Sequence, residues 1–91
     1  MKFLTEWKLM PGQTASAAKR FLAGGASPPE GLTIIARWHK ADLSGGIVIG
    51  ECDDPRVIYD DAVAWADLVE IRVTPAISDD EAGPILAKHF G

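Results

Sequence analysis

Arg37 and His39 are the residues whose types and spacing best suit chemistry on a small molecule. They stand two residues apart in a β-rich segment, so both side chains are expected on the same side of a strand. An imidazole can accept or release a proton near neutral pH. Arg37 could hold a carboxylate or phosphate while His39 moves the proton. The alternative is that His39 ends the strand and only hydrogen-bonds the loop that follows.

Glu51 is a second candidate for acid–base catalysis, because it ends an otherwise apolar segment. A carboxylate that is partly removed from water holds its proton more readily and can act as a base. Glu51 could instead pair with an arginine such as Arg37, or reach solvent. The catalytic residues predicted from the sequence are therefore His39 and Glu51, each beside a structural alternative.

Three tryptophans could line an aromatic pocket between helices and sheet, or could fill the core (Trp7, Trp38 and Trp65). We expect Trp65 to be a core residue. Trp7 and Trp38 are predicted to contact the apolar part of a ligand, and Arg37 its polar end.

The acidic pairs of the chain can be explained without a metal ion. Asp53-Asp54 and Asp79-Asp80 stand where helices are expected to begin, and free amides favour negative charge there. Asp60-Asp61 falls in mid-helix and is predicted to be a solvated face. Nitrogen and sulfur ligands lack the spacing of a zinc site (His39, Cys52 and His89). No phosphate-binding glycine loop or serine nucleophile motif occurs. We expect neither a metal nor a cofactor.

The composition narrows the range of partners. The net charge of −4, with Lys and Arg scattered along the chain, disfavours nucleic acid. No apolar run approaches the ~20 residues that cross a bilayer, and the first residues do not resemble a signal peptide. Cys52 is the only cysteine, which fits a reducing compartment. We expect a cytoplasmic protein that binds neither nucleic acid nor membranes.

Strands are predicted over residues 2–9, 32–39, 47–52 and 68–75, where β-formers dominate or apolar and polar residues alternate. A first helix is predicted over 14–23, with Thr14 as its cap and Gly24-Gly25 as its end.

Two further helices follow. One begins at Asp54-Pro55, since aspartate caps free amides and proline suits the first turn. The other begins at the capping box Ser78-Asp79-Asp80-Glu81, and Gly83-Pro84 is expected to make it short or broken.

The order β-α-β-β-α-β predicts a single α+β domain over residues 1–91. The expected fold is a ferredoxin-like sandwich: a four-stranded antiparallel sheet with both main helices on one face, plus a short C-terminal helix. A chain of this length has a thin core, which a second subunit can extend.

The face of the sheet without helices is expected to be too apolar for a purely solvated surface. Its predicted residues mix apolar and charged side chains (Leu4, Ile35, Val48 and Leu68 with Glu6, Arg37, Glu70 and Arg72). The composition favours a homodimer. A slip of one residue between the second and third strands would exchange the two faces, and the sequence does not fix that register.

Several motifs follow one another along nearly the whole chain: Arg37-Trp38-His39, Gly45-Gly46, Glu51 with Asp53-Asp54, Trp65-Ala66-Asp67-Leu68 and Val73-Thr74-Pro75. Together they resemble a small bacterial family of domains of unknown function in the dimeric α+β barrel superfamily. The resemblance implies a dimer whose sheets face each other, with helices outside and pockets between sheet and helices. That superfamily includes cofactor-free monooxygenases, isomerases and haem-degrading enzymes, so it implies no single activity.

Two functions remain open. The first is a small-molecule-binding protein or cofactor-independent enzyme that uses Arg37, His39, Trp7 and Trp38. The second is a non-enzymatic dimeric module for interaction or regulation. A cavity of ~300 Å³ or more with Arg37 or His39 converging on it would favour the first, and a fully packed interior would favour the second.

Overall fold

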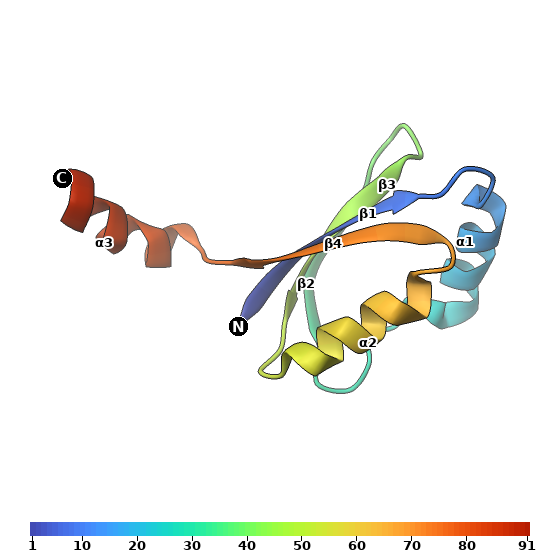
Figure 1. The fold of residues 1–91 in the computed structure, drawn as a ribbon, viewed down its shortest axis with the longest axis horizontal. Coiled ribbons are helices and arrows are strands. Elements are labelled where there is room, and N and C mark those ends of the chain that lie inside the picture. The colour runs from blue at the N-terminus through green and yellow to red at the C-terminus, as the bar shows by residue number, and fades with distance from the viewer.

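Four strands and the helices between them follow the order predicted from the sequence (Figure 1). The computed structural model describes all of residues 1–91. The elements are β1 (Lys2–Leu9), α1 (Thr14–Arg20), a π-helical turn η1 (Phe21–Gly25), β2 (Thr33–His39), β3 (Gly45–Glu51), α2 (Pro55–Trp65), β4 (Val69–Ala76) and α3 (Asp79–Phe90).

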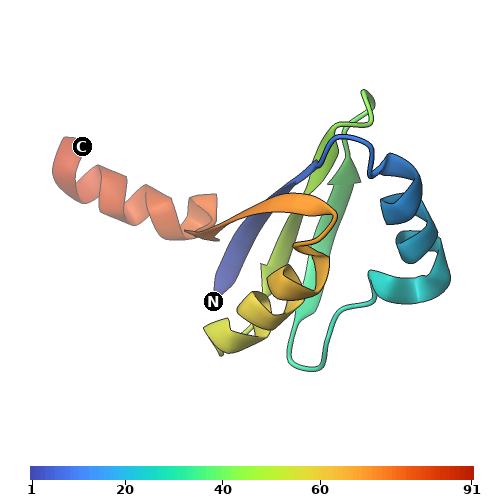
Figure 2. The same ribbon diagram turned by 45° about the vertical axis from the view of Figure 1, so that its right-hand side comes forward.

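The strands form one antiparallel sheet in the order β2-β3-β1-β4. α1 and α2 lie on one face of this sheet, and the opposite face has no helix over it (Figure 2). This is the α+β ferredoxin-like arrangement expected from the sequence, and the fold prediction is confirmed. The side of the sheet without helices is its open face.

The alternation in β1 separates the two faces of the sheet. Phe3, Thr5 and Trp7 point toward the helices, where Phe3 joins the core and the other two line a cavity. Each is flanked by residues that point the other way, because side chains alternate along a strand. Leu4 and Glu6 therefore belong to the open face.

A β-bulge at Ile35 sets the register of the hairpin between β2 and β3. Ile34 is paired with Gly50, while Arg37 is paired with Val48. The extra residue lets Ile34 and Arg37 face the helices although they are three positions apart. The prediction that Val48 and Arg37 lie on the open face was therefore wrong.

The apolar residues of β3 on the open face are Ile47 and Ile49. They are paired with Glu6 and Leu4 of β1, respectively, so they point away from the helices. Leu68 had also been expected there, but it precedes β4 and is only 5% exposed in the core.

Two small apolar clusters between sheet and helices form the core. The first contains Phe3, Leu32, Cys52 and Ile58, and the second contains Ala17, Leu68 and Val69. Only 10 of 91 residues are buried. This is the thin core that a chain of this length is expected to have.

The start of α2 matches its prediction. The Asp54 side chain accepts a hydrogen bond from the Arg56 N–H at 3.0 Å, and Pro55 occupies the first turn. Thr14 is the first residue of α1 rather than its cap. Gln13 occupies the cap position, and its side chain makes no capping hydrogen bond. Gly24, with φ of 88°, ends the helical segment in the left-handed region that glycine tolerates.

α3 runs unbroken through Gly83-Pro84 to Phe90, so the expectation of a short or broken helix was wrong. The predicted capping box is present: Ser78 Oγ accepts from the Glu81 N–H, and the Glu81 carboxylate accepts from the Ser78 N–H. Pro84 removes one helical bond, but the freed carbonyl lies on an exposed helix where water can reach it.

α3 projects away from the sheet (Figure 1). None of the helices combines the length and apolar character needed to span a bilayer.

Candidate functional site

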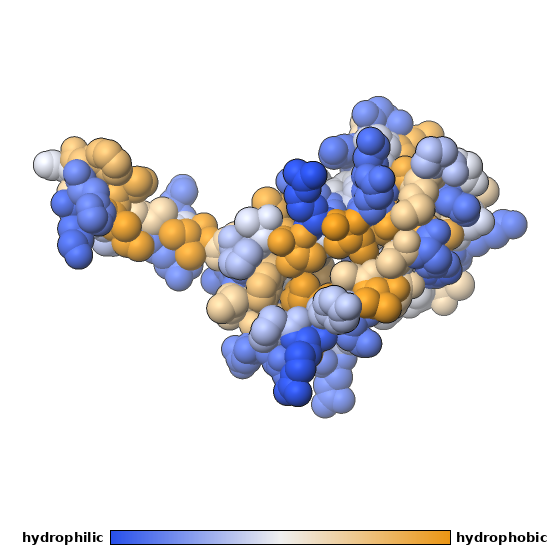
Figure 3. Space-filling view, in the orientation of Figure 1, coloured by the Kyte–Doolittle hydropathy of each residue, from blue (hydrophilic) through white to orange (hydrophobic).

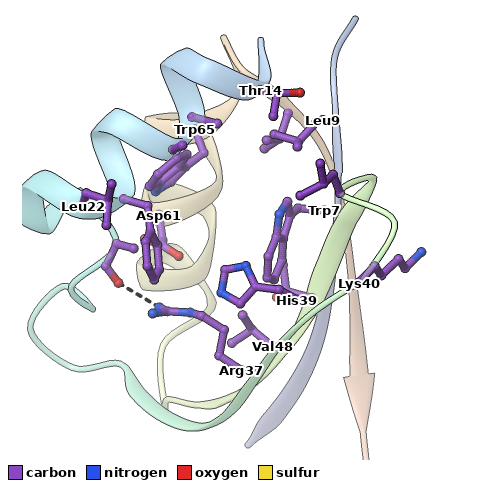
Figure 4. Close-up of a pocket in the computed structure, with 18 residues that line it drawn as sticks. Trp7, Leu9, Thr14, Leu22, Arg37, His39, Lys40, Val48, Asp61 and Trp65 are labelled. Carbon is purple, nitrogen blue, oxygen red and sulfur yellow. Dashed lines mark hydrogen bonds between the residues drawn. The ribbon is translucent and has the colours of Figure 1, made fainter.

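A cavity of about 410 Å³ lies between the sheet, α1, η1 and α2. Most of its wall is apolar, and a few polar side chains point into it from β2 and α2 (Figure 4).

The sheet forms the floor of the cavity in a row of three residues. His39 of β2 and Trp7 of β1 are each paired with Gly46 of β3, which lies between them. Gly46 has no side chain to separate them, so the two rings approach across β3. A Cβ at position 46 would overlap the indole of Trp7 and the carbonyl oxygen of Trp38. Only glycine fits this position with the rings as they are.

His39 is held between two aromatic rings. Its ring centroid lies 5.4 Å from that of Trp7 and 5.2 Å from that of Phe21, both in edge-to-face geometry. The structural alternative for His39 was a hydrogen bond to the loop that follows. The contacts that orient the imidazole are instead those with the rings of Trp7 and Phe21. The ring lines the cavity, as the catalytic hypothesis requires.

Arg37 lies two residues before His39 in β2, so both side chains are on the same face of the sheet. One guanidinium nitrogen donates to the Ala26 carbonyl oxygen at 2.8 Å, and the guanidinium carbon lies 5.7 Å from the centroid of the Phe21 ring. Arginine has five N–H donors, so this single bond leaves others for a ligand. The planar fork suits a carboxylate or another anionic group.

Asp61 of α2 also points into the cavity (Figure 4). Burial raises the pKa of its carboxyl; the positive charge of Arg37 opposes that rise and Asp60 adds to it. Asp61 and Arg37 also line a small second hollow of about 50 Å³. A carboxyl group whose protonated form is favoured can hold or accept a proton beside a ligand.

The sequence prediction for Asp61 was wrong, since a solvated face had been expected. Ile58, Asp61 and Trp65 are spaced by three and four residues, so they share one stripe of α2. Ile58 is buried in the core and Trp65 lines the cavity. That spacing is the signal that could have revealed Asp61.

A surface clamp joins α1 to the end of α2. The Arg20 guanidinium donates two hydrogen bonds to the Asp67 carboxylate, at 2.9 and 2.8 Å, and a third to the Ala64 carbonyl oxygen. The hydrogen bond from Arg20 lowers the pKa of Asp67. The guanidinium carbon of Arg20 also lies 5.3 Å from the centroid of the Trp65 ring, which lines the cavity. The clamp therefore holds the two helices that enclose the cavity.

Three of the five site residues predicted from the sequence meet in the cavity: Trp7, Arg37 and His39. Trp38 and Glu51 do not. Trp38 stands between Arg37 and His39 in β2, so the pleat turns it to the open face, where it is 68% exposed.

Glu51 is exposed and is paired with Lys2 and Thr33 at one end of the sheet. It therefore lies on the open face, with no path to Arg37.

Trp65, expected in the core, is half-buried and lines the cavity. No group of three His, Cys, Asp or Glu side chains is close enough to hold a metal ion.

Among solved structures, the chain is similar to that of a protein from Chloroflexus aurantiacus J-10-fl assigned as an antibiotic biosynthesis monooxygenase. The identity is 18%, the match covers 85% of this chain and 93% of that chain, and the TM-score is 0.42. No curated protein matches the sequence. The family model of a domain of unknown function, DUF3303, matches residues 1–90, which confirms the resemblance seen in the sequence motifs. The chain therefore belongs to the DUF3303 family.

Proposed function

We propose that this protein binds a small, mostly apolar molecule between its sheet and helices, as a binding protein or a cofactor-independent enzyme. The convergence of Arg37, His39 and Asp61 on a cavity of about 410 Å³ carries the proposal. Pockets for small molecules measure about 300–1,000 Å³ and combine apolar walls with few polar groups. This cavity has both properties.

The side chains that line the cavity suit a ligand with one polar end and one apolar part. Arg37 holds an anionic or carbonyl group with the N–H donors that the Ala26 carbonyl leaves free. The rings of Trp7 and Trp65 contact the apolar part. If the protein is an enzyme, His39 and Asp61 are the groups placed to move a proton, His39 because its imidazole lines the cavity and can act as a general acid or base. Asp61 qualifies because burial raises its pKa.

The proposal includes a homodimer. Leu4, Ile47 and Ile49 form an apolar strip on the open face, and the exposed indole of Trp38 extends it. A second subunit would remove this strip from water. The cytoplasmic location and bacterial origin expected from the sequence stay predictions.

The competing function is a dimeric module for interaction or regulation. A fully packed space between sheet and helices would have favoured it. The open cavity favours the small-molecule function instead, since a protein without a ligand gains nothing from leaving that space unfilled.

Binding of the aromatic sulfonate ANS (anilinonaphthalene sulfonate) tests the proposal, because this probe has an apolar ring system and one anionic group. Arg37→Gln should raise its Kd at least tenfold, since a hydrogen bond to a charged group contributes about 1.5–3 kcal/mol. Arg56→Gln is the matched control, because the side chain of Arg56 is 90% exposed and does not line the cavity. Equal Kd values for the two variants would contradict a role for Arg37.

A further inference from the structure

α3 exposes an apolar stripe that nothing in its own chain covers. Ile85, Leu86 and Phe90 are 56%, 56% and 86% exposed, and no residue of the helix is buried. Ala82 lies on the same stripe, four residues before Leu86. Figure 3 shows apolar side chains along α3 and along the segment that joins it to β4.

The helix is also poorly suited to exist alone. Helices shorter than ~12–15 residues are marginal in water even with favourable sequences, and α3 has 12 residues. Gly83 and Pro84 lower its intrinsic stability further. The capping box contributes only about 1 kcal/mol. An additional packing surface is needed to account for a regular helix here.

The dimensions of the whole chain lead to the same requirement. Its accessible surface is 6605 Å², whereas a compact monomer of 9.7 kDa exposes about 5,100 Å². Its radius of gyration is 15.1 Å, against about 12 Å for a compact chain of this length. The excess of about 1,500 Å² per chain falls within the roughly 1,000–2,500 Å² that each subunit of an obligate dimer buries.

The connection to β4 directs α3 away from its own sheet. Only Ile77 and Ser78 separate β4 from the helix, and the capping box fixes Ser78. The hydrogen bonds from Ser78 lower the pKa of Glu81, and the positive charges of Lys2 and the terminal amine lower it further, so the acidic first turn lies near the start of the chain. α3 therefore lies beyond the end of β4 rather than over the open face (Figures 1 and 2).

We propose that α3 is an arm exchanged between two copies of this chain, with its apolar stripe packed on the second subunit. This inference rests on the homodimer of the proposed function and adds the element that locks it. A two-fold pair exchanges both arms at once, so one assembly covers both stripes. The charges also suit such a pair, because the first turn of α3 is acidic (Asp79, Asp80 and Glu81) and its last turn is basic (Lys88 and His89). That distribution is complementary to itself in an antiparallel arrangement.

Sedimentation equilibrium of the full chain tests the arm. Leu86→Asp should raise the dimer Kd at least tenfold, whereas Ala87→Asp, one position away on the polar side of α3, should change it less than about threefold. If Leu86→Asp does not fold, Leu86→Ala is compared instead, and a weaker dimer appears as a Tm that depends more steeply on protein concentration.

Each outcome separates the claims. A wild-type dimer that neither charge variant weakens would overturn the exchanged arm and leave the homodimer in place. A wild-type monomer at all concentrations would overturn both the arm and the homodimer. ANS binding measured on the same samples tests the cavity independently, because the cavity lies on the other side of the sheet.

Discussion

The imidazole of His39 lies edge-on to the indole of Trp7, with 5.4 Å between the ring centroids and 81° between the ring planes. The contact spans two strand spacings, because Gly46 of the intervening strand has no side chain. An imidazole is thus oriented by aromatic contacts in the floor of the cavity. The residues of this row provide the sharpest tests of the site.

Replacing His39 separates packing from binding. His39→Ala removes two edge-to-face contacts worth about 0.5–1.5 kcal/mol each and should lower the Tm by a few degrees. It should also weaken ANS binding severalfold. His39→Phe keeps an aromatic ring without nitrogen atoms, so it should restore the Tm but not the affinity. Recovery of both by phenylalanine would make His39 a structural residue.

Gly46→Ala should destabilise the fold by about 1–3 kcal/mol, because the new methyl group overlaps the Trp7 ring and the Trp38 carbonyl oxygen. Gly83→Ala is the control. Nothing lies within 4 Å of a Cβ built on Gly83 in α3, so this change should alter the stability by less than about 1 kcal/mol, because the helix propensity gained by alanine is offset by the steric restriction on a residue before Pro84. Urea denaturation measures both effects. A Gly46→Ala variant as stable as the wild type would contradict the close approach of the rings.

The clamp between Arg20 and Asp67 predicts a dependence of stability on pH. The hydrogen bond from Arg20 lowers the pKa of Asp67 below the unfolded value of ~3.9, so folding favours the ionised form. The stabilisation is complete above that value and is lost as the pH falls through the folded pKa. The wild type should therefore have the higher Tm relative to Asp67→Asn at neutral pH, and the difference should vanish in strong acid. A difference independent of pH would contradict the ion pair.

Asp61 should change the stability of the fold with pH in the direction opposite to Asp67. Burial raises its folded pKa above ~3.9, so folding favours the protonated form. The contribution of Asp61 to stability is largest below the unfolded pKa and declines as the pH rises through the folded pKa. Asp61→Asn should match the wild type in Tm near pH ~3 and exceed it by a few degrees at neutral pH. Thermal melts across this range decide the point, and a variant less stable at neutral pH would refute it.

The local signals in the sequence predicted most of the fold. Asp54-Pro55 and the pair Ser78–Glu81 identified two helix starts because their side chains bond free amides within a few residues. The alternation of residues 2–9 identified β1 because the period of a strand does not depend on distant contacts. These features are local, and so they can be read without the fold.

The site depended on features that are not local. The bulge at Ile35 fixes which residues of β2 face the helices, and the sequence was compatible with either register. Trp38 was expected in the same pocket as its neighbours Arg37 and His39. Side chains alternate along a strand, so three consecutive residues cannot all face one pocket. Asp61 was missed because the polarity of the pair Asp60-Asp61 was weighed above its place on the apolar stripe of α2.

The central claim is that the cavity beside Trp7 and Trp65 is the binding site. The three tryptophans provide an internal control, because Trp38 lies on the open face and is 68% exposed. The measurement is a titration of nitrogen-15-labelled protein with ANS, followed through the indole N–H signals in two-dimensional NMR spectra. The account predicts saturable shifts of the Trp7 and Trp65 signals while that of Trp38 stays in place. Shifts of the Trp38 signal alone, or no saturable shift of any indole, would contradict it.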